Sequence, residues 1–538
     1  MERSLRAADS VPHVAPWRIV FVSAPGTSVF MEEILGAVAD AVREVGAPGL
    51  DVAGHRGLVS DIVDHRTVAV VVPHEYYVLA PDEPEALRAR TVAFGVEHPG
   101  TAEFETSARY GGLAGRFEIS AASIEELARR HVGATHFPLG LVPAWDCRAG
   151  VSDRDVDVTY LGTADERRTR ILARAAQDLA GLRTELVLPP HEQITGPRPD
   201  FLIGRDKWRL LARSKVLVNL HRGTKTALEW VRVLEAVTNG CAVVTEPSSD
   251  LGPLRPGEHL LVAEPDDIGR VAAELVRDEP RRAALVEAAH ELCRTQLDMT
   301  APAARLVETC REALDVSVPM DLAPTAAIEP GQYLAVWLPA VGGGAMAPPG
   351  LEPAPLATGT ARPTSDERLA VVCTRLAGDG GVAVTTASVA SELGDVAVHV
   401  RRGGPTAHRG AARNRLVEQS DEPFIAVLDA GDALLGDALE LMTDLLRNDP
   451  GLDAALCPAT HGDTLVNALL PDERRLRERV YLTRGYVVRR STLEALGGFT
   501  EKPELAGLVD HHFWLSLTAG GGRTAMLRRI GLALCAGS

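Results

Sequence analysis

The sequence lacks any long uninterrupted apolar run, and this absence bears on where the protein works. A membrane-spanning helix needs roughly 18–20 consecutive, predominantly apolar residues, and no segment of the 538-residue sequence approaches that length. The first 16 residues are polar and contain no apolar stretch of signal-peptide type. We therefore expect a cytoplasmic protein with no transmembrane segment.

Cysteine is scarce, and basic residues are outnumbered by acidic ones. The seven cysteines form no C-x-x-C pair, which argues against a disulfide framework and a zinc site and favours a reducing compartment. The net charge of −17 argues against a general nucleic-acid-binding surface.

A chain of 538 residues is too long for one hydrophobic core, so two to four domains are expected.

One segment departs from a globular composition. Residues 318–366 contain nine prolines and several glycine runs, which are typical of a linker. A short apolar stretch inside it, residues 333–338, could dock as a strand on either neighbour. The linker divides the chain into the predicted parts, which are a first lobe (17–145), a second lobe (146–317), the linker and a smaller α/β domain (367–538).

The part before the linker alternates apolar runs with helical periodicity, the pattern of α/β proteins with parallel sheets. We predict two Rossmann-like lobes. Their strands are expected at residues 18–23, 68–72, 92–94 and 117–119, then at 156–161, 186–188, 216–220 and 242–245. Helices are expected at about 165–179, 207–213, 226–238 and 267–277. Ligands bind such sheets at the carboxyl ends of the strands, which predicts a cleft between the lobes.

The turn after the strand at 156–161 is a candidate phosphate site. Gly162 permits close backbone approach, and the helix that follows offers N–H groups and the positive end of its dipole. Arg167 or Arg168 would add compensating charge. An ordinary strand-to-helix turn with solvated arginines explains the same residues, so both interpretations stay open.

The predicted helix at 226–238 presents a second candidate. Arg232 and Glu235 are three residues apart and can share one helix face. A carboxylate on a solvated cleft wall could accept hydrogen bonds from two ribose hydroxyls, and its substitution would then barely change stability. An exposed ion pair on a helix is the alternative.

The run from Arg232 to Ala236, followed by Asn239, Gly240 and the strand at 242–245, resembles the donor-binding signature of GT-B glycosyltransferases. The CgeB-like branch is the best match, and the stretch at 254–267 resembles the next strand and helix of these enzymes. The resemblance is good over about residues 156–314 and implies transfer of a sugar from a nucleotide-diphosphate sugar to an acceptor hydroxyl.

The resemblance also implies residue roles. Glu235 would hold the donor ribose, with Arg232, Gly162 and Arg167 around it, and His221 would touch the donor phosphates or sugar. No metal is required at such a site, because a helix dipole and side chains neutralise the leaving diphosphate. Many retaining members carry a glutamate where this chain has Ala227, so the stereochemical outcome stays open.

The first lobe should hold the acceptor and a catalytic base. His74 follows one predicted strand and is next to a carboxylate, and the pair Glu97 and His98 follows another. A histidine with a pKa near neutrality can deprotonate an acceptor hydroxyl. A histidine that caps a loop is the alternative for each of them.

The domain after the linker resembles the GT-A fold of family-2 glycosyltransferases, through residues 408–414, 424–434, 497–501 and 509–515. The resemblance implies a second site of Asp429, Asp432 and Asp510, which would need Mg²⁺ or Mn²⁺ if it is active. Gly431 stands in the middle of the aspartate cluster and the front of the domain is short, so we expect a diverged, accessory module.

Three functions fit these observations. The first is a glycosyltransferase whose GT-B cleft binds a nucleotide-sugar donor and an acceptor of unknown class. The second is a bifunctional enzyme with both modules active, and the third is a non-catalytic nucleotide-sugar-binding scaffold. The donor base, the sugar and the oligomeric state are left open by the sequence.

Overall fold

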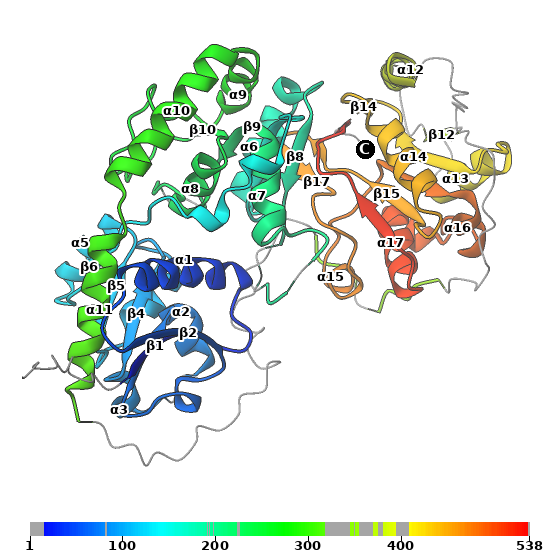
Figure 1. Ribbon diagram of the computed structural model, residues 1–538. Coiled ribbons are helices and arrows are strands. Elements are labelled where there is room, and N and C mark those ends of the chain that lie inside the picture. The colour runs from blue at the N-terminus through cyan, green and yellow to red at the C-terminus, as the bar shows by residue number, and fades with distance from the viewer. Residues whose placement is uncertain are drawn as a thin grey trace, which may run out of the picture.

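The computed structural model describes residues 16–80, 83–190, 192, 194–196, 198–222, 226–317, 345–348, 350–354, 369–374, 380–393 and 408–535. Two lobes are followed by a C-terminal unit, which lies beside the second lobe (Figure 1). In these ranges no helix is long and apolar enough to cross a bilayer. The stretch at 333–338 lies outside the described residues.

The first lobe is built on a six-stranded parallel sheet with the order β2-β1-β3-β4-β5-β6. Its strands are β1 (Trp17–Ser23), β2 (Leu50–Arg56), β3 (Thr67–Val71), β4 (Thr91–Gly95), β5 (Gly115–Glu118) and β6 (Thr135–His136). Its helices are α1 (Val29–Val45), α2 (Pro73–Leu79), α3 (Glu85–Arg88), α4 (Ala102–Ala108) and α5 (Ala121–Arg129). The central strands β3 and β4 are buried at every position, as continuous apolar runs of a covered parallel sheet should be.

The second lobe contains a five-stranded parallel sheet with the order β11-β10-β9-β7-β8. The strands are β7 (Val156–Leu161), β8 (Thr184–Val187), β9 (Ser214–Asn219), β10 (Ala242–Thr245) and β11 (Leu261–Val262). The helices are α6 (Glu166–Leu179), α7 (Gly204–Arg213), α8 (Trp230–Thr238), α9 (Ile268–Arg277), α10 (Glu279–Gln296) and α11 (Thr300–Leu314). Helix α11 returns to the first lobe and packs on α1 (Figure 1).

The predicted fold class, two Rossmann-like α/β lobes followed by a smaller α/β region, is confirmed. A strand forms at each of the eight predicted places, and β11 lies in the stretch that resembles the next strand of GT-B enzymes, whereas β2 and β6 were not predicted. Strand β2 lies at the sheet edge and is partly exposed along its length, so it lacks the apolar run of its neighbours. The helix expected at 226–238 begins only at Trp230.

The C-terminal unit has a mixed five-stranded sheet with the order β12-β13-β18-β15-β19 and a smaller sheet with the order β14-β20-β16-β17. Its strands are β12 (Leu369–Thr374), β13 (Phe424–Asp429), β14 (Ala433–Leu434), β15 (Ala454–Leu456), β16 (Ala459–His461), β17 (Thr464–Val466), β18 (Tyr486–Arg489), β19 (Thr524–Met526) and β20 (Leu532–Leu534). Its helices are α12 (Gly380–Leu393), α13 (Arg409–Glu418), α14 (Ala438–Asn448), α15 (Glu473–Glu478), α16 (Arg490–Ala495) and α17 (Val509–Ala519).

The second lobe and the C-terminal unit share one apolar core. Ile171 and Leu172 of α6 belong to the same buried cluster as Leu465, Leu469 and Ile530. The two parts also meet along the edge strand β8, where the backbone N–H of Leu186 donates to the carbonyl of Arg528 at 2.5 Å. The unit beyond the linker is therefore packed against the second lobe.

Candidate functional site

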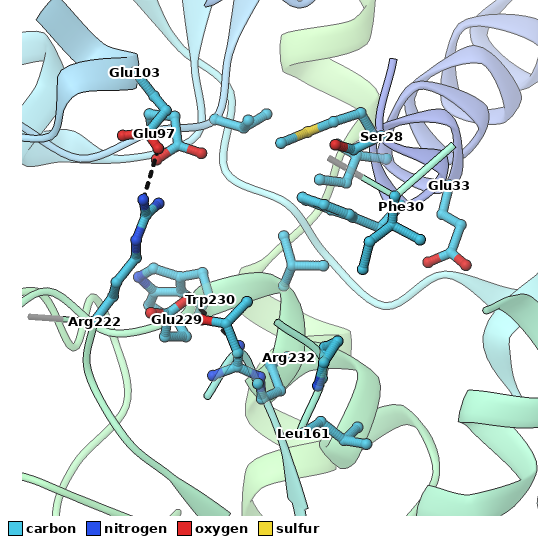
Figure 2. Close-up of a pocket in the computed structure, with 18 of the residues that line it drawn as sticks. Ser28, Phe30, Glu33, Glu97, Glu103, Leu161, Arg222, Glu229, Trp230 and Arg232 are labelled. Atoms are coloured by element: carbon cyan, nitrogen blue, oxygen red, sulfur yellow. Dashed lines mark hydrogen bonds and ion pairs between the residues drawn. The ribbon is translucent and has the colours of Figure 1, made fainter. Parts of the chain in front are cut away.

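A pocket opens between the two lobes, at the carboxyl ends of β3 and β4 on one side and of β7, β8 and β9 on the other. Figure 2 shows charged side chains from both lobes facing this space. The titratable residues that line it are Glu33, His74, Glu75, Glu97, His98, Glu103, Arg168, Glu192, Lys207, Arg222, Glu229, Arg232 and Glu235.

The turn after β7 forms one wall of the pocket. Gly162 lines it, and a Cβ at this position would come within 2.5 Å of the Tyr160 hydroxyl, so the turn needs glycine. Helix α6 then begins with Asp165 as N-cap, whose side chain accepts from the backbone N–H of Arg168 at 2.9 Å. The N-terminus of α6 thus stands at the carboxyl end of β7, as an anion site requires.

Arg168, rather than Arg167, faces the pocket. It is 2% exposed and donates to Thr163 Oγ1 at 2.9 Å and to Glu229 at 2.8 Å. Arg167 instead forms an ion pair with Glu246, and neither residue lines the pocket. Of the two arginines that the sequence offered for phosphate, the geometry favours Arg168.

Glu229 and Arg232 lie together on the second-lobe side of the pocket (Figure 2). Burial alone would raise the pKa of Glu229, but Arg232 and Arg168 lower it to about 2. Arg232 also donates to Asn219 Oδ1 at 3.1 Å. Arg232 was expected to share a helix face with Glu235, but it pairs with Glu229 instead. Glu229 is therefore an ionised carboxylate in the cleft that the sequence analysis did not identify.

Glu235 lines the pocket but does not stand on a solvated wall. Its side chain is 4% exposed, and its Oε1 atom lies 2.6 Å from Lys207 Nζ and 3.0 Å from Trp208 Nε1. Lys207 reaches across to Glu33 of the first lobe, at 2.5 Å. The expected solvated position is wrong, because Glu235 belongs to a buried ion network that joins the two lobes.

In this network the opposite charges offset the effect of burial on one another's pKa values. Burial by itself would lower the pKa of Lys207, but Glu235 and Glu33 raise it above its usual value. Burial raises the pKa of Glu33, against the effect of Lys207. One buried ammonium group thus stands between two carboxylates from different lobes.

The first-lobe candidates meet on the opposite side of the pocket. His74 stands in the first turn of α2 and Glu97 follows β4, and their Nε2 and Oε1 atoms are 3.7 Å apart. Burial lowers the pKa of His74 to about 4, whereas burial and the nearby Glu103 raise the pKa of Glu97 to about 8. His98 also lines the pocket. Glu97 is therefore the group of this trio whose pKa is close to neutral, and the neutral His74 ring is a weak base.

An ion pair bridges the lobes beside Glu97. Arg222, which follows β9 in the second lobe, donates to Glu103 of α4 at 2.7 Å (Figure 2). Burial would raise the pKa of Glu103, but Arg222 lowers it. These two residues are 119 positions apart, so no local sequence signal could have paired them.

His221 is buried and does not line the pocket. Its backbone N–H donates to Glu246 at 2.7 Å, and its Nε2 atom is 2.8 Å from Ser248 Oγ. Burial lowers its pKa despite the nearby Glu246. Neither His221 nor Arg167 lines the pocket, whereas Gly162, Arg232, Glu235 and the first-lobe trio do.

The aspartates of the C-terminal unit lie close together, but each of them is paired with arginine side chains. Asp432 accepts from Arg484 through both oxygens at 2.8 Å, and Asp510 accepts from Arg413 at 2.6 Å. Burial alone would raise the pKa of Asp429, but Arg413 and other arginines lower it. These side chains therefore do not fit a divalent cation. Nowhere in the described ranges are three or more His, Cys, Asp or Glu side chains grouped as a metal site.

Residues 158–308 match the family described as glycosyl transferase-like. This match confirms the enzyme class expected from the sequence, a glycosyltransferase. Among solved structures, HepE (Alr3699) of Anabaena with UDP-glucose is similar at 12% identity and a TM-score of 0.38, over 55% of this chain and 99% of HepE. A fragment of TarS of S. aureus with UDP-GlcNAc is similar at 13% identity and a TM-score of 0.26, over 32% of this chain and 59% of the fragment. No curated protein matches.

Proposed function

We propose that the cleft between the lobes binds a nucleotide-diphosphate sugar and transfers its sugar to an acceptor hydroxyl. The observation that carries this proposal is the convergence of the Gly162 turn, the N-terminus of α6, Arg168 and Arg232 at the carboxyl ends of β7 and β9. Backbone N–H groups and two guanidinium groups are suited to a diphosphate. The glycosyl transferase-like match over residues 158–308 covers this half of the cleft.

In this proposal the second lobe holds the donor. Arg168 and Arg232 bind the diphosphate, and Glu229 keeps them in place through its ionised carboxylate. Lys207 and Trp208 both hold Oε1 of Glu235, so Oε2 would accept from a ribose hydroxyl. The donor site needs no metal, because the α6 dipole and the arginines stabilise the leaving diphosphate.

The first lobe supplies the base. Glu97 has a pKa of about 8 and faces the pocket, so its carboxylate can take the proton of an acceptor hydroxyl while the oxygen attacks the anomeric carbon. The bond from that carbon to the diphosphate oxygen breaks, and the diphosphate leaves with the electron pair. His74 and His98 border this space, and His74 stays neutral beside Glu97.

Three finer features belong to the same proposal. The chain is of the CgeB-like GT-B type, on the strength of the run from Arg232 to Ala236. The C-terminal unit is a diverged GT-A module with an accessory role, which the arginine-filled aspartate cluster supports. The seven cysteines are all free thiols, which suits a cytoplasmic location.

Replacing Arg232 with methionine should weaken binding of uridine diphosphate, the nucleotide present in the HepE and TarS crystals, by about ten- to a hundredfold. One charge-assisted hydrogen bond is worth about 1.5–3 kcal/mol, and about 1.4 kcal/mol corresponds to one decade in Kd. Calorimetric titration of uridine diphosphate measures this change. The matched control is Arg209→Met, since Arg209 is exposed on α7 and pairs weakly with Asp206. Equal affinity in the wild type, Arg232→Met and the control would reject the proposed diphosphate site.

A further inference from the structure

The pocket has one wall with little regular structure. This wall segment consists of the described residues from Val187, the last residue of the edge strand β8, to Leu202, shortly before α7. The residues of the wall segment that line the pocket are Val187, Pro189, Glu192, Ile194, Phe201 and Leu202. A segment without a hydrogen-bonded helix or sheet must be held in shape by other contacts.

The C-terminal unit supplies such contacts from behind. The Nη2 atom of Arg475 lies 3.5 Å from Oε1 of Glu192, and Nη2 of Arg474 lies 3.6 Å from its other oxygen. A residue of the wall segment itself, Arg198, also pairs with Glu192. The Glu192 side chain is 11% exposed, so removing one of its positive partners should be costly.

Arg475 is itself fixed. Its side chain is 11% exposed, and its guanidinium group lies 5.7 Å from the centre of the Tyr481 ring. The Tyr481 hydroxyl accepts from the backbone N–H of Asp472 at 2.8 Å and donates to the carbonyl of Leu470 at 3.0 Å. The Asp472 side chain in turn caps α15 by accepting from the backbone N–H of Arg475 at 2.8 Å.

A second contact lies at the other end of the wall segment. Arg528, which also pairs through its backbone with the edge strand β8, donates from Nη2 to the carbonyl of Pro199 at 3.0 Å. The shared apolar core of α6 with Leu465, Leu469 and Ile530 keeps the two parts in register. The C-terminal unit therefore contacts the wall segment at two places, Glu192 and Pro199.

We propose that the C-terminal unit is a brace for the pocket, and that Arg475 is a positioning residue that holds the wall segment through Glu192. This assigns the unit a role in the cleft between the two lobes. The effect on nucleotide affinity rests on the proposed function, because the wall segment borders the donor half of the cleft. The effect on the mobility of the wall segment does not rest on the proposed function.

Hydrogen–deuterium exchange of the full chain without ligand tests the brace. In Arg475→Ala, peptides covering residues 187–203 should exchange about three- to tenfold faster, which is ~0.7–1.4 kcal/mol at 1.4 kcal/mol per decade. Peptides covering β1 should be unchanged. Arg475→Lys, which keeps the charge, should restore part of the protection.

The matched control is Arg477→Ala on the same helix, because Arg477 is exposed and pairs with Glu473 of α15 itself. Unchanged exchange of residues 187–203 in Arg475→Ala would overturn the brace, and so would an equal increase in β1, which would indicate general destabilisation. Titration of uridine diphosphate separates the two proposals. Failure of the wild type to bind uridine, cytidine, adenosine or guanosine diphosphate contradicts the proposed function. Equal binding of uridine diphosphate by wild type and Arg475→Ala contradicts a role of the brace in the donor site.

Discussion

On the proposed function, Glu97→Gln is expected to slow the release of the nucleoside diphosphate from the nucleotide-sugar donor, with water as the acceptor, by about 10²–10⁴-fold, the effect typical of losing a general base. Glutamine keeps the shape of the side chain but cannot take a proton. Burial and Glu103 raise the pKa of Glu97 and so disfavour its charged form, and a neutral amide in its place should not weaken the fold. The variant should thus separate catalysis from stability.

The same substitution should change the pH dependence of the reaction. A base must be ionised to act, and the pKa of Glu97 is about 8. The wild-type rate should therefore rise with pH up to about 8 and level off above it, and this rise should be missing in Glu97→Gln. Glu105→Gln on α4 is the matched control, since Glu105 pairs with Arg130 on the surface. A wild-type rate in Glu97→Gln would remove Glu97 from catalysis.

Lys207→Met is expected to lower the free energy of unfolding by about 3–5 kcal/mol, the usual effect of removing one partner from a buried ion pair. Lys207 is the cation between Glu33 and Glu235, and all three side chains are at most 13% exposed. Without the ammonium group two buried carboxylates face each other across the lobes. Denaturation by urea measures the change.

Lys215→Met is the control for this effect. Lys215 also lies in the second lobe, but its side chain is more exposed, at 29%, and its ammonium group pairs with the partly exposed Asp157. Such pairs contribute about 0–1 kcal/mol. If Lys207→Met costs no more than Lys215→Met, the interlobe network does not stabilise the fold.

The strands that position the site could be predicted from the sequence because they are buried. Strands such as β3 and β4 are buried at every position, and the α/β order of the chain places their carboxyl ends at one cleft. Strand β2 was not predicted, because it lies at a sheet edge, is partly exposed and lacks a continuous apolar run. Local pattern therefore predicted the scaffold and the turn at Gly162.

The charge environment of the site could not be predicted in this way. Glu235 was identified from its place on a helix, but the ion network around it was not. In that network Lys207 pairs with Glu33, which is more than 170 positions away in the sequence. Glu229 lies only three residues from Arg232, so helical spacing could have revealed it. The arginines that occupy Asp429, Asp432 and Asp510 come from distant segments, and only the folded chain brings them together.

A crystal structure of the full chain with UDP-glucose in the presence of EDTA tests the central claim most directly. We expect density for the nucleotide in the cleft, with the diphosphate at the N-terminus of α6 beside Arg168 and Arg232, and with the ribose against Glu235. Density for the nucleotide beside Asp429, Asp432 and Asp510 instead, with an empty cleft, would contradict the claim.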